Sequence, residues 1–425
     1  MKKCEFTLII IFFTLLFTSC AAPVNTIGTS GNNNQNIDSQ QSVSSPDGEK
    51  EAEQPELYDM FRQGIAPICV DDKWGYIDKN GTYLITPQYE RAFPFRYGLA
   101  AVETNGKIGF INMDGKFVIK PQFDEAYIFD SHQLAYVKSE GHYGYINTSG
   151  EYVIAPQFDS ACAFDESGLA VVGIGNQYGF IDMTGSFVIN PRFTEAYSFE
   201  SSDFAPVQLD TKWGYVSKKG EIVIDCQFDA AYPFDESRLA LVKIGEKFGF
   251  IDQTGAFVIN PIYDEALEFG RNNITPVKSN DLWGYIGIDG EYVIETQFEE
   301  ADSFAPNGLA KVKLGGKWGY IDISGKIIIN PVFDYAYSFS DYGLAGVIVD
   351  KSGLNCDWGY IDETGEYVIP LHHSTNSLTL LFDFDINGFA VVFADSEFGV
   401  ISADDKWFFQ LGEGYIDSVD WERFN

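Results

Sequence analysis

The sequence predicts an all-β protein, an array of about ten antiparallel repeats of three to four short strands each. The hexapeptide KWGYID at Lys73–Asp78 returns unchanged at Lys317–Asp322, and eight variants of it occur elsewhere in the chain. Aromatic residues make up 16% of the chain, a content that suits strands. Turn sequences that close on Gly follow the hexapeptides at a regular distance. Ten copies of a catalytic centre would be strange, so the hexapeptide is interpreted as a structural joint.

The central Gly of each hexapeptide marks the period. Successive markers lie 34 residues apart once, 35 apart six times and 40 apart twice. Such regular spacing is typical of repeat architectures, in which neighbouring repeats complete one another's core. The markers are Gly75, Gly109, Gly144, Gly179, Gly214, Gly249, Gly284, Gly319, Gly359 and Gly399.

One repeat can be followed from Leu99 to Phe129. Residues 99–103, 107–112 and 116–120 are predicted strands, separated by the turns TNG and NMDG. The leading Asp or Asn of the second turn can cap its own turn, and the closing Gly supplies a left-handed residue. Pro121 ends the third strand because proline has no N–H to donate. The connector FDEAYIF, which could hold a fourth short strand, leads into the next repeat.

The hexapeptide alternates its side chains between the two faces of a strand. We expect Gly to leave a bare patch on which an aromatic ring of the connector lies flat, Tyr89 or Phe123 for example. The preceding position is Ile108 in one repeat, so a flat ring is not required there, and packing is favoured over ligand stacking. The predicted structural core includes the marker glycines and the tryptophans Trp74, Trp213, Trp283, Trp318 and Trp358.

The array can be open or closed. A repeat of 35 residues is short for a propeller blade, which takes about 40–45, and ten blades exceed the usual range. We therefore expect an open solenoid or superhelix. The alternative is a large, propeller-like closed ring.

The N-terminal segment is a separate device. Lys2 and Lys3 precede a short apolar run, and a small residue leads into Cys20, as in a bacterial lipoprotein signal. Residues 1–19 are interpreted as the signal peptide and Cys20 as the lipidated residue. Residues 20–56 form a polar tether of disordered composition, and the repeat domain spans 57–425. The expected location is extracytoplasmic, with contact to a bacterial membrane through the lipid anchor alone.

The repeats resemble the WG (KWG-type) repeat family of bacterial proteins. The aromatic-Gly-aromatic core, the D/N-x-x-G turn, the VIxP strand and the FDEA connector carry the resemblance, from about residue 57 to 425. The family implies a β-rich repeat array that serves binding or scaffolding. It implies no catalytic residue.

The sequence offers little for catalysis. None of the four His lies in a known catalytic or zinc motif, and no phosphate-binding loop is present. A recurring acidic column, Asp124 and its equivalents, supplies one carboxylate per repeat, whereas Ca²⁺ needs six to eight converging oxygens. We therefore expect no enzyme activity, no cofactor and no metal. The net charge of −34 makes nucleic acid a poor partner.

Three functions remain: a binding or scaffold module for a protein partner, a cell-envelope glycan binder, and a structural spacer. A row of open rings would favour glycan, and scattered polar and acidic groups would favour protein. The period breaks at two insertions, and insertions in repeat arrays are often found on the binding face. The candidate binding residues in these two loops are Lys351, Asn355, His372, His373 and Asn376.

Overall fold

The computed structural model describes residues 61–70, 73–199, 202–270, 272–350, 356–374, 379–385, 387–394 and 397–411. The predicted signal, Cys20 and tether lie outside these residues. The described chain divides into two compact units, residues 61–303 (unit 1) and 304–410 (unit 2). One 3₁₀ turn, η1 (Arg62–Gly64), precedes the first strand, and all other described elements are strands.

Unit 1 consists of small antiparallel sheets that follow one another along the chain. Its strands are β1 (Ile65–Val70), β2 (Lys73–Asp78), β3 (Tyr83–Tyr89), β4 (Arg91–Ala92), β5 (Leu99–Thr104), β6 (Lys107–Asn112), β7 (Phe117–Phe123), β8 (Glu125–Ala126), β9 (Ala135–Ser139), β10 (His142–Ile146), β11 (Tyr152–Phe158), β12 (Ser160–Ala161), β13 (Leu169–Ile174), β14 (Gln177–Asp182), β15 (Phe187–Phe193), β16 (Glu195–Ala196), β17 (Phe204–Leu209), β18 (Lys212–Ser217), β19 (Ile222–Phe228), β20 (Ala230–Phe234), β21 (Ala240–Ile244), β22 (Lys247–Ile251), β23 (Phe257–Tyr263), β24 (Glu265–Ala266), β25 (Ile274–Ser279), β26 (Leu282–Gly287), β27 (Tyr292–Phe298) and β28 (Glu300–Ala301).

Unit 2 continues the same pattern. Its strands are β29 (Leu309–Leu314), β30 (Lys317–Asp322), β31 (Ile327–Phe333), β32 (Tyr335–Ala336), β33 (Ala345–Asp350), β34 (Cys356–Ile361), β35 (Tyr367–Ser374), β36 (Leu380–Leu381), β37 (Phe389–Ala394), β38 (Glu397–Ser402) and β39 (Lys406–Leu411).

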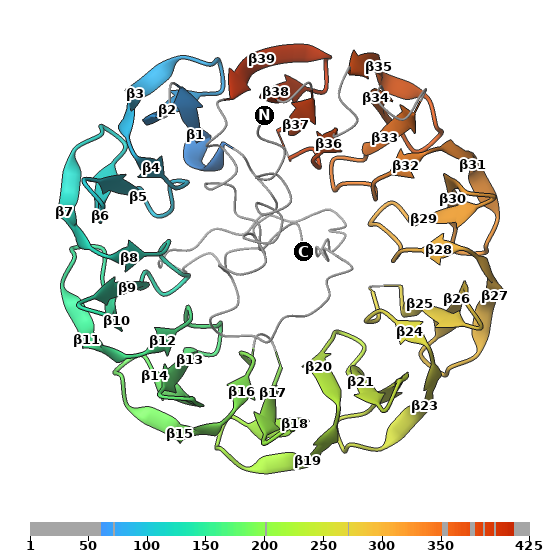
Figure 1. Ribbon diagram of the computed structural model, residues 1–425, viewed down its shortest axis with the longest axis horizontal. Coiled ribbons are helices and arrows are strands. Elements are labelled where there is room, and N and C mark those ends of the chain that lie inside the picture. Colours follow the sequence, from blue (N-terminus) through green and yellow to red (C-terminus); the bar gives the residue numbers. More distant parts are fainter. Residues whose placement is uncertain are drawn as a thin grey trace, which may run out of the picture. The chain divides into compact units, whose positions relative to one another are not determined.

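Each complete sheet holds four strands in chain order. In the order β4-β5-β6-β7, the connector supplies the short first strand, the hexapeptide is the third and the VIxP segment is the fourth. Within unit 1 the short first strands lie on the inner side of the fan of sheets and the long fourth strands on the outer side (Figure 1). The predicted all-β repeat array is confirmed, including the fourth short strand. Successive blade-like sheets of this kind also fit the propeller-like alternative.

The marker Gly is needed because backbone crosses over it. Trp74 pairs with Tyr89, but Tyr76 pairs with Ile85, so three residues of β3 bulge out opposite Gly75. A Cβ on Gly75 would lie 2.5 Å from the Ile85 carbonyl oxygen and 2.6 Å from the Pro87 nitrogen. Seven further marker glycines, from Gly109 to Gly319, meet the equivalent backbone atoms at 2.5–2.7 Å.

The expected flat ring on the Gly is therefore wrong. Tyr89 lies opposite Trp74, and Phe123 lies opposite Ile108, so these rings neighbour the first aromatic position instead. The nearest atoms to a Cβ on Gly75 all belong to the β3 backbone. A ring lying flat on Gly75 would need the space that the bulged backbone of β3 occupies. At Gly399 alone the obstacle is a ring, that of Trp407, at 2.2 Å.

The second aromatic position joins neighbouring sheets. The Tyr76 ring packs against Phe95 at a centroid distance of 4.8 Å, and its hydroxyl donates to the Phe93 carbonyl at 2.7 Å. Phe93 and Phe95 follow the first strand of the next sheet. Tyr145, Tyr215 and Tyr320 donate in the same way, at 2.7 Å each, to the carbonyl 17 residues further along. Each hexapeptide is thus a joint to the following repeat.

The D/N-x-x-G turns are built as expected. The Asp78 carboxylate accepts hydrogen bonds from the Asn80 and Thr82 N–H groups at 2.9 and 2.8 Å. These bonds lower the pKa of Asp78, with the Thr82 N–H as the largest cause. Gly81 closes the turn at a φ of 77°, a left-handed conformation that favours glycine. A Cβ on Gly115, in the following turn, would lie 3.4 Å from the Ile85 side chain of the preceding sheet.

Candidate binding surface

The outer strands of most sheets each contribute one exposed aliphatic residue, and together these residues form a column outside the core. The column occupies the second position of the fourth strands, and its exposed members have 37–48% of their surface accessible. Val118, Val153, Val188, Val223 and Val258 lie outside the buried clusters of their sheets. We call the members in unit 1 the aliphatic column: Leu84, Val118, Val153, Val188, Val223, Val258 and Val293. Ile328 and Val368 hold the same position in unit 2, where Ile328 is half-buried and packs against the core of its sheet.

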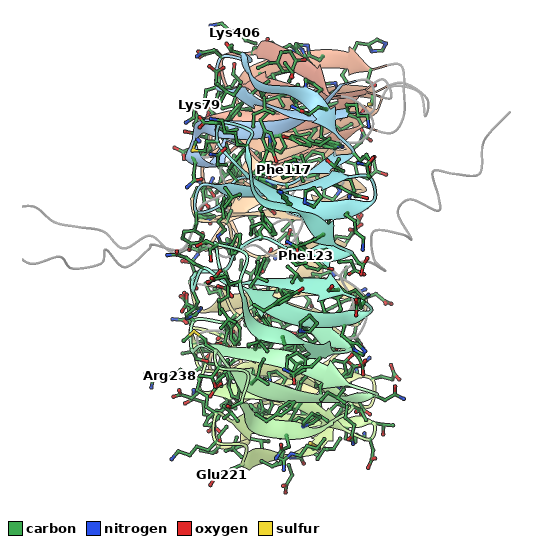
Figure 2. All side chains as sticks on the ribbon, turned by 90° about the vertical axis from the view of Figure 1, so that its left-hand side faces the viewer. Lys79, Phe117, Phe123, Glu221, Arg238 and Lys406 are labelled. Atoms are coloured by element: carbon green, nitrogen blue, oxygen red, sulfur yellow. The ribbon has the colours of Figure 1, made fainter. Side chains whose placement is uncertain are left out.

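The first position of the same strands forms a second column, mostly aromatic. Phe117, labelled in Figure 2, is 40% exposed and packs edge-on against Tyr89 of the preceding sheet at 6.3 Å. Tyr152 packs on Phe123 in the same way at 6.2 Å. These rings pack between neighbouring sheets and are half-buried, with one side open to solvent. Ile222 and Ile327 interrupt the row of rings, whereas the aliphatic column has no polar member.

The recurring acidic column binds backbone and lysine. The Asp229 carboxylate accepts the Gly245 N–H at 2.7 Å and contacts Lys212 Nζ at 2.6 Å. Lys212 belongs to the preceding sheet, so the pair clamps two repeats together. The hydrogen bond from Lys212, followed by that from Gly245, lowers the pKa of Asp229. Asp124 with Lys107, Asp264 with Lys247 and Asp334 with Lys317 repeat the arrangement.

Metal binding finds no support in this part of the chain. Among the residues that the structure describes, no group of three or more His, Cys, Asp or Glu side chains is placed to hold a metal ion. The acidic column runs from sheet to sheet, and four of its carboxylates each meet a different lysine, whereas Asp159 meets His142. The geometry spreads these groups out instead of bringing them to one point.

The candidate residues in the two insertions are placed as follows. Lys351, Asn355 and Asn376 lie outside the described residues. His372 and His373 lie on β35, not in a loop, and they pair with Trp358 and Asp357 of β34. This strand has eight residues instead of seven, because pairing continues through His373 and Ser374. His372 takes the place of the usual Phe opposite Trp358, and the bulge before it is one residue shorter than in the other sheets.

The two histidines make separate contacts. His372 stacks on Trp358 at 4.8 Å, and its Nε2 lies 2.7 Å from Asp405 Oδ1. The His373 Nδ1 lies 2.9 Å from Asp357 Oδ1, and Asp357 is nearly buried. Asp357 occupies the position that lysine holds in other repeats, and His373 occupies the position of the usual Asp, so the acidic residue of the pair stands on the other strand. A direct role for the histidines in binding stays a prediction.

Sequence reasoning missed four carboxylates on the outer strands. Glu221 and Asp225 flank Val223, and Glu291 and Glu295 flank Val293. All four carboxylates are exposed, and no side-chain partner is found for them within the described ranges. The available signal was a double period: Glu151, Glu221 and Glu291 stand 70 residues apart, whereas Ser186 and Ala256 occupy the two repeats between them.

The comparison with known families decides the family. The pattern of the WG containing repeat matches nine consecutive segments: 74–107, 108–141, 143–178, 178–213, 213–248, 248–283, 283–318, 318–351 and 358–372. These segments cover more than half of the chain. The chain belongs to the WG-repeat family. The WG-repeat segments end before Gly399, where the Trp407 ring replaces the backbone crossing.

Solved structures give only distant likeness to this WG-repeat chain. A eukaryotic initiation factor is 12% identical with a TM-score of 0.48, over 73% of this chain and 95% of the other. The extracellular domain of the one-component system BT4673 from B. thetaiotaomicron is 9% identical with a TM-score of 0.28, over 86% and 68%. PorZ of Porphyromonas gingivalis is 10% identical with a TM-score of 0.23, over 81% and 57%. No curated protein matches the chain. None of the described helices is long and apolar enough to cross a membrane.

Proposed function

We propose that this WG-repeat protein is a non-catalytic binding or scaffold module for a protein partner, tethered to the outer side of a bacterial membrane by lipid on Cys20. The aliphatic column carries the proposal. It repeats on successive outer strands, is open to solvent and takes no part in the buried clusters named above. Exposed apolar patches that span many elements mark interaction sites.

A protein fits this surface better than a glycan does. Sugars stack on flat rings, and the aromatic column is broken by Ile222 and Ile327. In the sheet of Ile222 the aliphatic column is unbroken, because Val223 occupies its position there. Aliphatic side chains offer area for hydrophobic burial and nothing for ring stacking. The half-exposed rings keep envelope glycan as the alternative.

The test immobilises the parent repeat domain and two matched triple variants on beads and measures what each of them retains. Val118→Thr, Val153→Thr and Val188→Thr keep β-branching while removing apolar surface from the column. Ile174→Thr, Ile244→Thr and Leu282→Thr remove a similar amount of exposed apolar surface at the opposite end of the strands. Both proteins are offered solubilised envelope proteins and, separately, purified wall polysaccharide.

The column variant should retain roughly tenfold less of a discrete envelope protein than the parent, and the control variant should match the parent. Equal retention by all three proteins would contradict the proposal. Retention of polysaccharide alone, sensitive to the column, would establish the glycan alternative instead.

A further inference from the structure

The exposed carboxylates of β19 and β27 define a narrower partner for the aliphatic column. Side chains at alternate positions of a strand share one face. Val223 and Asp225 therefore share the outward face of β19, and Glu221 directly precedes this strand. Val293 and Glu295 likewise share the outward face of β27, and Glu291 directly precedes it. The intervening residues Ile224 and Ile294 are buried, in agreement with this alternation. These two outer strands, together with the residue before each of them, thus present an acidic-apolar-acidic triplet.

The fold itself does not use these carboxylates. Glu151, the equivalent of Glu221 two sheets earlier, accepts Asn147 Nδ2 at 3.1 Å and Ser149 Oγ at 3.2 Å. Glu221 and Glu291 take part in the turn before the strand through their backbone. Their N–H groups donate to Ser217 Oγ and Asp289 Oδ1, and their carbonyls accept from the N–H groups of Ser217 and Gly287. Arg192, on the outer strand β15 of the preceding sheet, donates to the Gly220 carbonyl at 2.6 Å.

We infer that β19 and β27 bind a polypeptide segment in which basic and apolar side chains alternate. The inference rests on the proposed function and narrows its partner. Along a strand, residues two apart are separated by about 7 Å, so Glu221, Val223 and Asp225 form a row that only another extended chain matches in step. Lysine or arginine at two such positions, with an apolar residue between them, meets two carboxylates and one valine.

A second copy of this chain is a poor occupant of the same strands. It would bring its own Glu and Asp triplets and a net charge of −34. Like charges placed directly opposite each other destabilise strand pairing. Glu221, labelled at the lower end of Figure 2, is exposed, so an approaching chain finds it accessible.

The probe is a short synthetic peptide of alternating Lys and Val, labelled for fluorescence anisotropy. Peptides of alternating Lys and Ser, and of alternating Glu and Val, serve as comparisons. The site variant carries Glu221→Gln, Asp225→Asn, Glu291→Gln and Glu295→Gln. The control variant removes four carboxylates from the opposite end of the strands, by Glu140→Gln, Asp210→Asn, Glu246→Gln and Asp281→Asn, so both variants have the same net charge.

The Lys-Val peptide should bind the parent and the control variant alike, and bind the site variant roughly tenfold more weakly. The Lys-Ser and Glu-Val peptides should bind little. Equal losses in the two variants would show attraction by net charge alone and overturn the inference. Equal binding of Lys-Ser and Lys-Val would overturn it too, because the valines would then be idle.

The variants also separate this inference from the proposed function. If the site variant retained the envelope protein as well as the parent does, while the valine variant lost it, the docking function would stand and the basic-apolar partner would be wrong. Equal thermal midpoints of parent, site and control variants confirm that folding is unchanged.

Discussion

Substitution of Gly249 by Ala tests the origin of the repeated glycine most directly. Gly249 has an ordinary negative φ, so an alanine there suffers no backbone strain of its own. The new Cβ would lie 2.6 Å from both the Ile259 oxygen and the Pro261 nitrogen, whereas ordinary contacts begin at 3.4 Å. The β23 backbone must therefore retreat by 3.4 − 2.6 = 0.8 Å.

That displacement strains the two pairs that hold the bulge in place, Phe248 with Tyr263 and Phe250 with Ile259. Overpacking of this kind costs about 3 kcal/mol, and Gly249→Val costs more. Gly270→Ala is the matched control, since a Cβ there meets nothing within 4 Å. Trp213→Phe should cost only about 1 kcal/mol, because Phe248 and Phe398 already occupy that position in other repeats.

Urea unfolding followed by tryptophan fluorescence gives the free energy of unfolding of each variant. A second substitution separates backbone from ring as the obstacle. If the Tyr263 ring were the obstacle, Tyr263→Leu would restore the stability lost in Gly249→Ala. We expect no such rescue. A rescue, or equal losses in Gly249→Ala and Trp213→Phe, would refute the account of the joint.

Three further predictions each concern a single residue. Thr275 Oγ1 donates at 2.7 Å to the Leu267 carbonyl, the acceptor that Tyr hydroxyls use elsewhere; Thr275→Ala should cost about 1 kcal/mol, and adding Phe250→Tyr should restore it in the same urea assay. Burial raises the pKa of Asp383 to about 6, so its charged form is disfavoured in the folded state and stability should fall as the pH rises from about 4 through 6. Asp383→Asn should remove this loss, on the order of 2 kcal/mol, from thermal midpoints measured across that range, and an unchanged pH profile would count against it. Cys20→Ser should release the protein from the membrane fraction on cell fractionation, and a variant that stays bound like the parent would disprove lipid anchoring at this residue.

Much of the fold could be predicted because the ten repeats show which residue types each position of a repeat accepts. The Asx turn capped by Asp78 and the short strand at Ala126 follow from local rules of turn geometry and alternation. The bulge could not be predicted, because a wide crossing and a stacked ring both require glycine at the same position. Register decides between them, and register depends on how residues pair across strands.

The surface was harder to predict than the core. A search for broken periodicity led to His372 and His373, which the structure places on a strand and in contact with Asp405 and Asp357. The exposed carboxylates near Val223 recur only in every second repeat, so a comparison that treats all repeats as equivalent does not detect them. Burial had to be known before an unused carboxylate could be distinguished from one such as Asp229, which clamps two sheets.

The short reach of the joints has a consequence for how the chain folds. The tyrosine hydroxyl bonds span 17 residues, as do the clamps such as Lys212 with Asp229. Contacts of such small sequence separation lose little chain entropy on closure, and proteins rich in them fold fast. A chain that emerges from its N-terminus can therefore complete one sheet as soon as the next connector is free, and each finished sheet becomes the template for its successor. Completion of one sheet therefore requires only its neighbour, and not the last repeat of the chain.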